Sequence, residues 1–111
     1  MKVPSLRGPY LLSSDRVKLA VTQNSPGVYA TGSIKFGQLD PSYVGRSDND
    51  LAAQLLKQIG IHANFSYAYA SSALIAYQLE CEMYHAWKPR DNHVHPAKPQ
   101  NSNLKCPVCG Q

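Results

Sequence analysis

The sequence predicts a small α+β domain: a three-stranded, mostly antiparallel sheet flanked by helices, followed by a cysteine-bearing tail. The length of 111 residues fits one domain with one core. Runs rich in β-branched and aromatic residues alternate with runs of helical periodicity. The end of the chain lacks periodicity but is rich in histidine and cysteine. We therefore expect an N-terminal extension packed on the domain (1–25), the domain (26–95) and a tail (96–111).

Two strands are predicted in the first half of the domain. "GVYATG" (27–32) and "SYVGRS" (42–47) have the composition of strands. The residues between them include Gly37 and the pair Asp40–Pro41, which favour a loop. The two strands should therefore form an antiparallel pair with a long connection. Upstream, "RVKLAV" fits either a short strand or one helical turn.

A helix should follow the second strand. Apolar residues fall there at i, i+4, i+5 and i+8, which places on one helical face Leu51, Leu55, Leu56 and Ile59. Asp48 or Asn49 can cap its start, and Gly60 stands where a helix ends.

A third strand and a second helix complete the predicted domain. "NFSYAYA" (64–70) alternates aromatic and small residues, as a half-buried strand does. Ser71 or Ser72 can cap a helix over about 73–87, which Pro89 ends.

One acidic residue of this second helix falls on its apolar face. Glu80 is surrounded at helical spacing by apolar and aromatic residues, namely Ala76, Tyr77, Met83 and Tyr84. Glu82 has more polar neighbours and should face water. A carboxylate on a buried face needs a partner. Glu80 is therefore either held by an ion pair or a tyrosine hydroxyl, or it serves as a metal-binding or acid/base carboxylate.

Charge and composition limit the classes of function. The net charge is +4 and the pI is near 9.1, which permits binding to nucleic acid without requiring it. No apolar run is long enough to span a membrane, and the apolar stretch around Leu11 is too short for a signal peptide. Three cysteines are an odd number for a disulfide framework. We therefore expect a cytoplasmic protein without a membrane partner.

The tail contains a cysteine pair with the spacing of a zinc knuckle. Cys106 and Cys109 are separated by two residues and followed by Gly110. A structural zinc takes four ligands, so this pair can supply half of a site. The alternative is two free thiols or a redox couple.

The other two zinc ligands should lie upstream. Cys81 and His85 are at i and i+4 on the second predicted helix, which would complete a Cys₃His site. His93 and His95 are alternative ligands. A zinc ion bound in this way would hold the tail against the helix.

Several basic residues are candidates for phosphate contacts, although a solvated surface is the alternative for all of them. These candidates are Lys57, Lys88, Arg90, His95 and Lys98.

The order of these motifs resembles the GIY-YIG nuclease family over about 26–95. The resemblance rests on Gly-Val-Tyr ending at Tyr29, Tyr-Val-Gly beginning at Tyr43, the helix with Glu80, and a later asparagine, Asn92. The cysteine-bearing tail is similar to that of one subgroup of this family.

The resemblance implies a metal-dependent endonuclease. Of Tyr29 and Tyr43, one would orient the attacking water and the other the scissile phosphate. Glu80 would hold a single Mg²⁺ or Mn²⁺ ion, and Asn92 would support the site by hydrogen bonding. DNA is the expected substrate, with RNA as the alternative, and sequence specificity would require a homodimer or a larger complex.

One position departs from the family pattern. The family has an arginine in the helix after the second triplet, and this chain has Gln54 there, or Ala53 if the loop is one residue shorter. Arg46 or Lys57 would then have to supply the positive charge. The alternative functions are a catalytically impaired module that binds nucleic acid or protein, and a zinc-organised adaptor.

Overall fold

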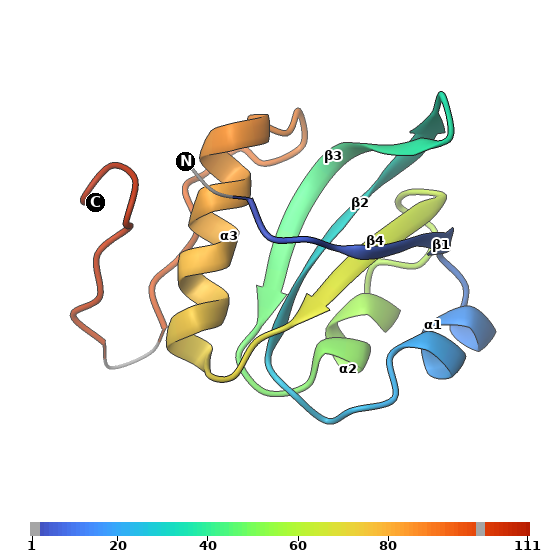
Figure 1. The fold of residues 1–111 in the computed structure, drawn as a ribbon, viewed down its shortest axis with the longest axis horizontal. Helices are drawn as coiled ribbons and strands as arrows, with labels where there is room; N and C mark the ends of the chain where they lie inside the picture. Colours follow the sequence, from blue (N-terminus) through green and yellow to red (C-terminus); the bar gives the residue numbers. More distant parts are fainter. Residues whose placement is uncertain (1–2, 100–101) are drawn as a thin grey trace.

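The computed structural model describes residues 3–99 and 102–111. Figure 1 shows its strands and helices, whose bounds in chain order are β1 (Arg7–Leu11), α1 (Ser14–Ala20), β2 (Gly27–Lys35), β3 (Gln38–Ser47), α2 (Leu51–Leu56), β4 (Asn64–Tyr69) and α3 (Ala73–Trp87). Within this described part, no helix has both the length and the apolar character needed to cross a membrane.

The sheet has four strands in the order β1-β4-β2-β3, and all neighbours are antiparallel. The α+β class is therefore confirmed, but the prediction of three strands was wrong. The additional strand, β1, comes from the segment expected to be an extension. Gly8 and Pro9 lie within it and conceal its strand character in the sequence. An edge strand tolerates proline because one side of its backbone needs no partner.

The connection between β2 and β3 is also shorter than expected. The strands continue to Lys35 and resume at Gln38, so that only Phe36 and Gly37 form the turn. Asp40 and Pro41 are strand residues and not part of a loop. A shift of register between β2 and β3 beside this segment accommodates the proline, again on an edge strand.

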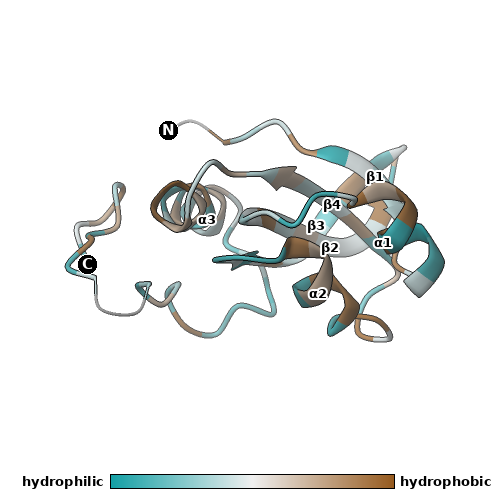
Figure 2. Ribbon diagram, turned by 90° about the horizontal axis from the view of Figure 1, so that it is seen from below, coloured by the Kyte–Doolittle hydropathy of each residue, from teal (hydrophilic) through white to brown (hydrophobic). Residues whose placement is uncertain are grey.

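Helices cover both faces of the sheet (Figure 1). Tyr29 packs on one face with buried residues of α1 and α2, such as Val17 and Leu55. Its neighbour Val28 packs on the other face with α3, where Met83 is buried. Figure 2, in which α3 is seen nearly end-on, shows the sheet between this helix and α2. The segment "RVKLAV", left open between strand and helix, lies mostly in α1.

The ends of α2 differ from the prediction. Asp50 caps α2, because its side chain accepts a hydrogen bond from the Ala53 amide. Neither Asp48 nor Asn49 occupies the cap position. The helix ends at Leu56, which leaves Ile59 outside it.

The prediction for α3 is confirmed at both ends. The helix spans Ala73–Trp87, and Ser72 caps it by accepting from the Ile75 amide. Glu80 is buried on its inner face, with 7% of its surface exposed, as its apolar neighbours predicted.

Candidate functional site: a cleft at the sheet edge and a histidine–cysteine cluster

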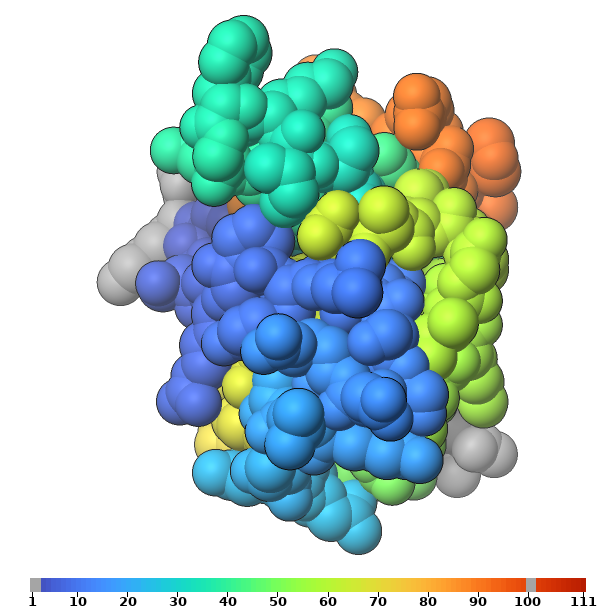
Figure 3. Space-filling view, turned by 90° about the vertical axis from the view of Figure 1, so that its right-hand side faces the viewer, coloured from blue at the N-terminus to red at the C-terminus, as the bar shows by residue number. Residues whose placement is uncertain are grey.

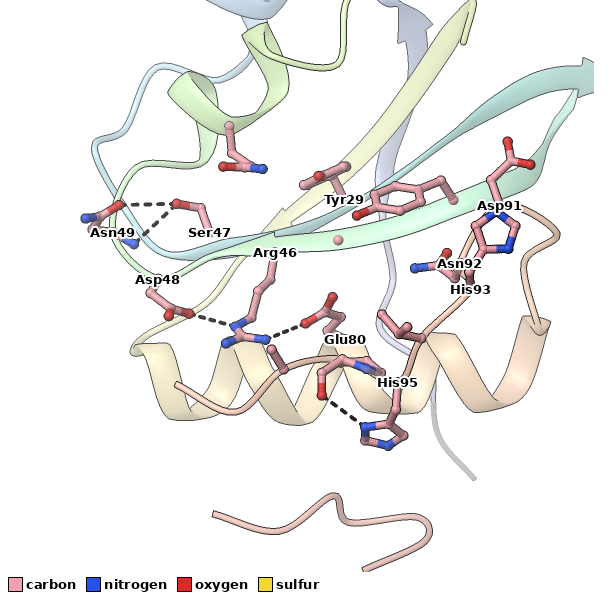
Figure 4. A pocket seen from close by; sticks show the side chains of 16 residues that line it. Tyr29, Arg46, Ser47, Asp48, Asn49, Glu80, Asp91, Asn92, His93 and His95 are labelled. Carbon is pink, nitrogen blue, oxygen red and sulfur yellow. Dashed lines mark hydrogen bonds and ion pairs between the residues drawn. The ribbon is translucent and has the colours of Figure 1, made fainter. Parts of the chain in front are cut away.

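A cleft of about 600 Å³ lies at the free edge of β3 (Figure 4). Its walls come from both faces of the sheet and from the segment after α3. The lining residues are Tyr29, Tyr43, Gly45, Arg46, Ser47, Asp48, Asn49, Gln54, Glu80 and residues 91–97. The fold therefore brings together the side chains of Tyr29, Tyr43, Arg46, Glu80 and Asn92 that the motifs singled out.

The two tyrosines meet across the β2–β3 pair. Their ring centroids are 6.3 Å apart, and Tyr29 lies opposite Gly45 in the ladder. A Cβ atom on Gly45 would lie 2.5 Å from Cζ of Tyr29, so the hydroxyl reaches the cleft only because residue 45 has no side chain. Burial raises the pKa of both Tyr29 and Tyr43. Both phenols therefore stay protonated at neutral pH and can donate hydrogen bonds.

An ion pair crosses the opposite side of the cleft. Nη1 of Arg46 donates to Oε1 of Glu80 at 2.7 Å, and Nε of Arg46 donates to Oδ1 of Asp48 at 2.7 Å (Figure 4). The Arg46 and Glu80 side chains are only 11% and 10% exposed. Burial raises the pKa of the Glu80 carboxyl, and the hydrogen bond from Arg46 opposes this rise. The arginine is thus the partner that the buried carboxylate requires.

Asn92 binds the backbone of β3 at Val44, the residue between Tyr43 and Gly45. Its Oδ1 accepts from the Val44 amide at 2.8 Å, and its Nδ2 donates to the Val44 carbonyl at 3.0 Å. The amide of Asp91 donates to the Ser42 carbonyl at 2.9 Å. These contacts hold the segment after α3 against the edge of the sheet, so that this segment forms one wall of the cleft.

A chain of three side chains, which no sequence pattern predicted, supports the same segment. His62 lies between Thr31 and Asp91, with Nδ1 2.9 Å from the Thr31 hydroxyl and Nε2 2.7 Å from Oδ2 of Asp91. The hydrogen bond with His62 lowers the pKa of Asp91. No local motif marks His62, because its partners are distant in sequence. The position of Asp91 beside Asn92 was the only available signal.

Gln54 occupies the place where the family resemblance implies an arginine. It lies on α2 and lines the cleft, close enough to Tyr29 to oppose in part the larger effect of burial, which raises the pKa of that phenol. Lys57, the other suggested source of charge on this side, follows α2 and is exposed outside the residues that line the cleft. The arginine that does line the cleft is Arg46, on β3.

A second site lies where the tail meets α3. Ligand atoms of His85, His95, Cys106 and Cys109 all lie within 4.8 Å of one another. Nε2 of His95 is 3.3 Å from Nε2 of His85 and 3.5 Å from Sγ of Cys109. Nδ1 of His95 donates to the Pro96 carbonyl at 3.0 Å, which leaves the Nε2 lone pair facing the cluster.

The chemistry of this cluster fits a metal ion. Two histidines and two cysteines form a ligand set that zinc takes in structural sites. Burial opposes ionisation of the Cys106 thiol, but hydrogen bonds from the amides of Cys109 and Val108 lower its pKa to about 6. The thiolate, which is the form that binds metal, is therefore favoured near neutral pH. The cluster can hold a metal ion, as expected for a structural zinc.

The set of four differs from the one first expected. Cys81 lies outside it, buried with Tyr77 and Cys106. Burial raises the pKa of the Cys81 thiol to about 12, so it remains a neutral and poor ligand. His95, one of the two alternatives, takes its place. His93, the other alternative, lines the cleft but is not in the cluster.

Most of the proposed phosphate-contacting residues lie away from the cleft. His95 lines it and also belongs to the metal-binding cluster. The remaining candidates are exposed on the surface and do not line the cleft, namely Lys57, Lys88, Arg90 and Lys98.

The chain is thus a small α+β domain with two candidate sites. Phenols, a carboxylate and an arginine meet in the cleft at the edge of the sheet, and a histidine–cysteine cluster lies where the tail meets α3. No protein-family model, curated protein sequence or solved structure matches the chain. The resemblance to the GIY-YIG family rests on the motifs alone and stays a prediction.

Proposed function

We propose that this chain is a metal-dependent endonuclease that hydrolyses phosphodiester bonds in DNA. The observation that carries the proposal is the meeting of Tyr29, Tyr43 and Glu80 around one cleft, although they come from β2, β3 and α3. Hydrolysis of a phosphodiester needs a group that orients water, a group that orients phosphate, and positive charge near the reacting oxygens. The cleft contains side chains suited to each of these tasks.

Glu80 is the residue suited to hold a divalent cation. Its carboxylate is a hard oxygen ligand in the cleft wall, and Mg²⁺ binds through one or two carboxylates while it keeps several waters. When bound, such an ion would polarise the phosphodiester. The two phenols, both protonated at neutral pH, would orient water and phosphate by donating and accepting hydrogen bonds.

Arg46 is the residue suited to replace the arginine that α2 lacks. Its guanidinium lines the cleft and already contacts Glu80. A metal ion on Glu80 would compete with that contact, while the contact with Asp48 would still hold the arginine in place. Arg46 would then be free to stabilise the charge that develops on the phosphate.

The second candidate function is a binding module on the same fold. The observation that favours it is Gln54, whose neutral amide lines the cleft with Tyr29 where the family resemblance implies an arginine. An amide lacks the permanent, forked charge of arginine. In this case the cleft would bind nucleic acid without cleaving it.

A plasmid-nicking assay with Mg²⁺ and Mn²⁺ tests both candidates. The variants are Glu80→Gln, the matched control Glu82→Gln on the same helix, and Gln54→Arg. For a nuclease, we expect the wild type and Glu82→Gln to cut DNA and Glu80→Gln to lose about 10²-fold or more in rate.

The outcomes separate the two functions. Activity that appears only in Gln54→Arg would mean that an otherwise intact site is silenced at this position, which supports the binding module for the natural chain. DNA binding without cleavage by any variant would also support the module. Equal cleavage by the wild type and Glu80→Gln would refute the proposed role of the cleft.

A further inference from the structure

The tip of the β2–β3 hairpin presents an aromatic ring to solvent. Phe36 has a relative exposure of 103%, the highest among the exposed large hydrophobic residues of the described part of the chain. Ile34, on the same hairpin, is 42% exposed. The hairpin projects beyond the rest of the domain in the space-filling view (Figure 3). Burial in the core therefore does not account for an aromatic residue at this position.

The geometry of the turn does not account for it either. Phe36 and Gly37 have φ angles of 53° and 77°, so both are in the left-handed region. Two-residue turns with positive φ favour asparagine or aspartate followed by glycine. A bulky residue at positive φ is strained, and such strain persists mainly at functional positions. The turn would form more easily with asparagine in place of Phe36.

The tip is a direct continuation of the strands that carry the cleft. Tyr43 and Gln38 are both in β3, and Gln38 pairs with Lys35 next to the turn. At about 3.4 Å per residue, the chain from Phe36 to Tyr43 spans at most roughly 24 Å, the length of about seven stacked nucleotides. A nucleic acid that enters the cleft and follows the edge of β3 would therefore reach the tip.

The edge between the cleft and the tip carries two exposed basic side chains, each beside an aspartate. Nη2 of Arg90 donates to the Ser42 hydroxyl at 3.2 Å, which places this exposed guanidinium beside β3. Lys35 lies next to the tip, 3.1 Å from Asp40. Figure 1 shows the segment after α3 alongside β3, on the way to the hairpin. A phosphate backbone along this edge would compete with Asp91 and Asp40 for these two cations before it reaches the aromatic ring.

From these observations we propose that Phe36 is a nucleic-acid contact that stacks against an unpaired base about seven nucleotides from the phosphate in the cleft. This inference rests on the proposed function, because the substrate in the cleft sets the path of the strand. Base–aromatic stacking tolerates any sequence, since every base has a flat face. The tip would thus fix the register of the substrate without selecting a sequence.

Binding to a fluorescein-labelled DNA duplex with single-stranded extensions, which leave bases unpaired, tests the proposal by fluorescence anisotropy. The parent protein carries Glu80→Gln, so that the duplex is not cut. We expect Phe36→Ala to weaken binding by about 5- to 100-fold. Phe36→Tyr keeps the ring, and the control Ile61→Ala removes another exposed apolar side chain, 61% exposed, elsewhere on the surface; both should stay within about twofold of the parent.

A single-tryptophan variant reports the contact directly. Trp87 is the only tryptophan in the chain, so Trp87→Phe combined with Phe36→Trp leaves one indole at the tip. We expect its fluorescence to be quenched when duplex is added. The Arg90→Gln variant should reduce the slope of log K against log salt by about 0.9, as the loss of one phosphate contact predicts.

The results distinguish failure of this inference from failure of the proposed function. If the parent binds DNA but Phe36→Ala binds equally well and the indole is not quenched, the tip is not a contact, and the nuclease proposal stands. If the parent binds no nucleic acid, both fall. If light scattering shows that Phe36→Ala dissociates an oligomer and binding per chain is unchanged, the tip serves self-association and the inference is overturned.

Discussion

Replacement of Arg46 by methionine should destabilise the protein in a way that depends on pH. The substitution removes the partner that donates to Oε1 of Glu80 at 2.7 Å and leaves a carboxylate that is 10% exposed. Loss of one member of a buried ion pair typically lowers the free energy of unfolding by about 3–5 kcal/mol. Glu80→Gln should lower it less, by about 1–2 kcal/mol, because Arg46 keeps its bond to Asp48.

The sign of the pH effect follows from the pKa of Glu80. Burial raises this pKa in the folded protein, so the folded state binds the proton more tightly than the unfolded state. Stability therefore falls as pH rises from the ordinary pKa of glutamate to the raised value in the folded state. Without Arg46 the pKa rises further, and this pH window widens.

Urea unfolding followed by circular dichroism at pH 5 and pH 8 measures these differences. We expect Arg46→Met to lower the free energy of unfolding more at pH 8 than at pH 5, by at most about 1.4 kcal/mol for each pH unit. Glu80→Gln added to Arg46→Met should restore stability at pH 8, because the unpaired charge is gone. A loss that is equal at both pH values and is not restored by Glu80→Gln would refute the reasoning.

Three further predictions concern the cleft walls and the metal-binding cluster. Gly45→Ala should displace Tyr29, because the new methyl group would collide with the phenol. We expect it to lower the free energy of unfolding by about 1–3 kcal/mol and to reduce any cleavage rate by about 10²-fold. Adding Tyr29→Leu should restore stability in urea unfolding but not activity. Asn92→Ala should lose both hydrogen bonds to the Val44 backbone, so hydrogen exchange at the Val44 amide should become faster. An unchanged exchange rate would contradict the role of Asn92 in holding this segment against β3. Native mass spectrometry should find one zinc ion per chain, which His95→Ala loses and Cys81→Ala keeps; the reverse pattern would show that the expected Cys₃His set was right.

The local chemistry of the sequence was enough to predict several elements. The capped helix over 73–87 and the burial of Glu80 follow from short-range spacing, because residues three and four apart share a helical face. The cysteine pair predicted half of a metal-binding site, because a separation of two residues is the spacing of a zinc knuckle. The strand beginning at Gly27 was predicted from its composition.

Only the tertiary structure decided which distant residues meet. β1 joins the sheet through pairing with β4, and its glycine and proline give no local signal for a strand. His95 replaces Cys81 in the cluster because the path of the tail, and not helical spacing, brings its Nε2 beside His85. Arg46 of β3 pairs with Glu80 of α3, because the buried carboxylate needs a partner and the packing of α3 on the sheet brings the two together. Contacts of this kind depend on how the sheet and helices pack, which short-range sequence patterns do not encode.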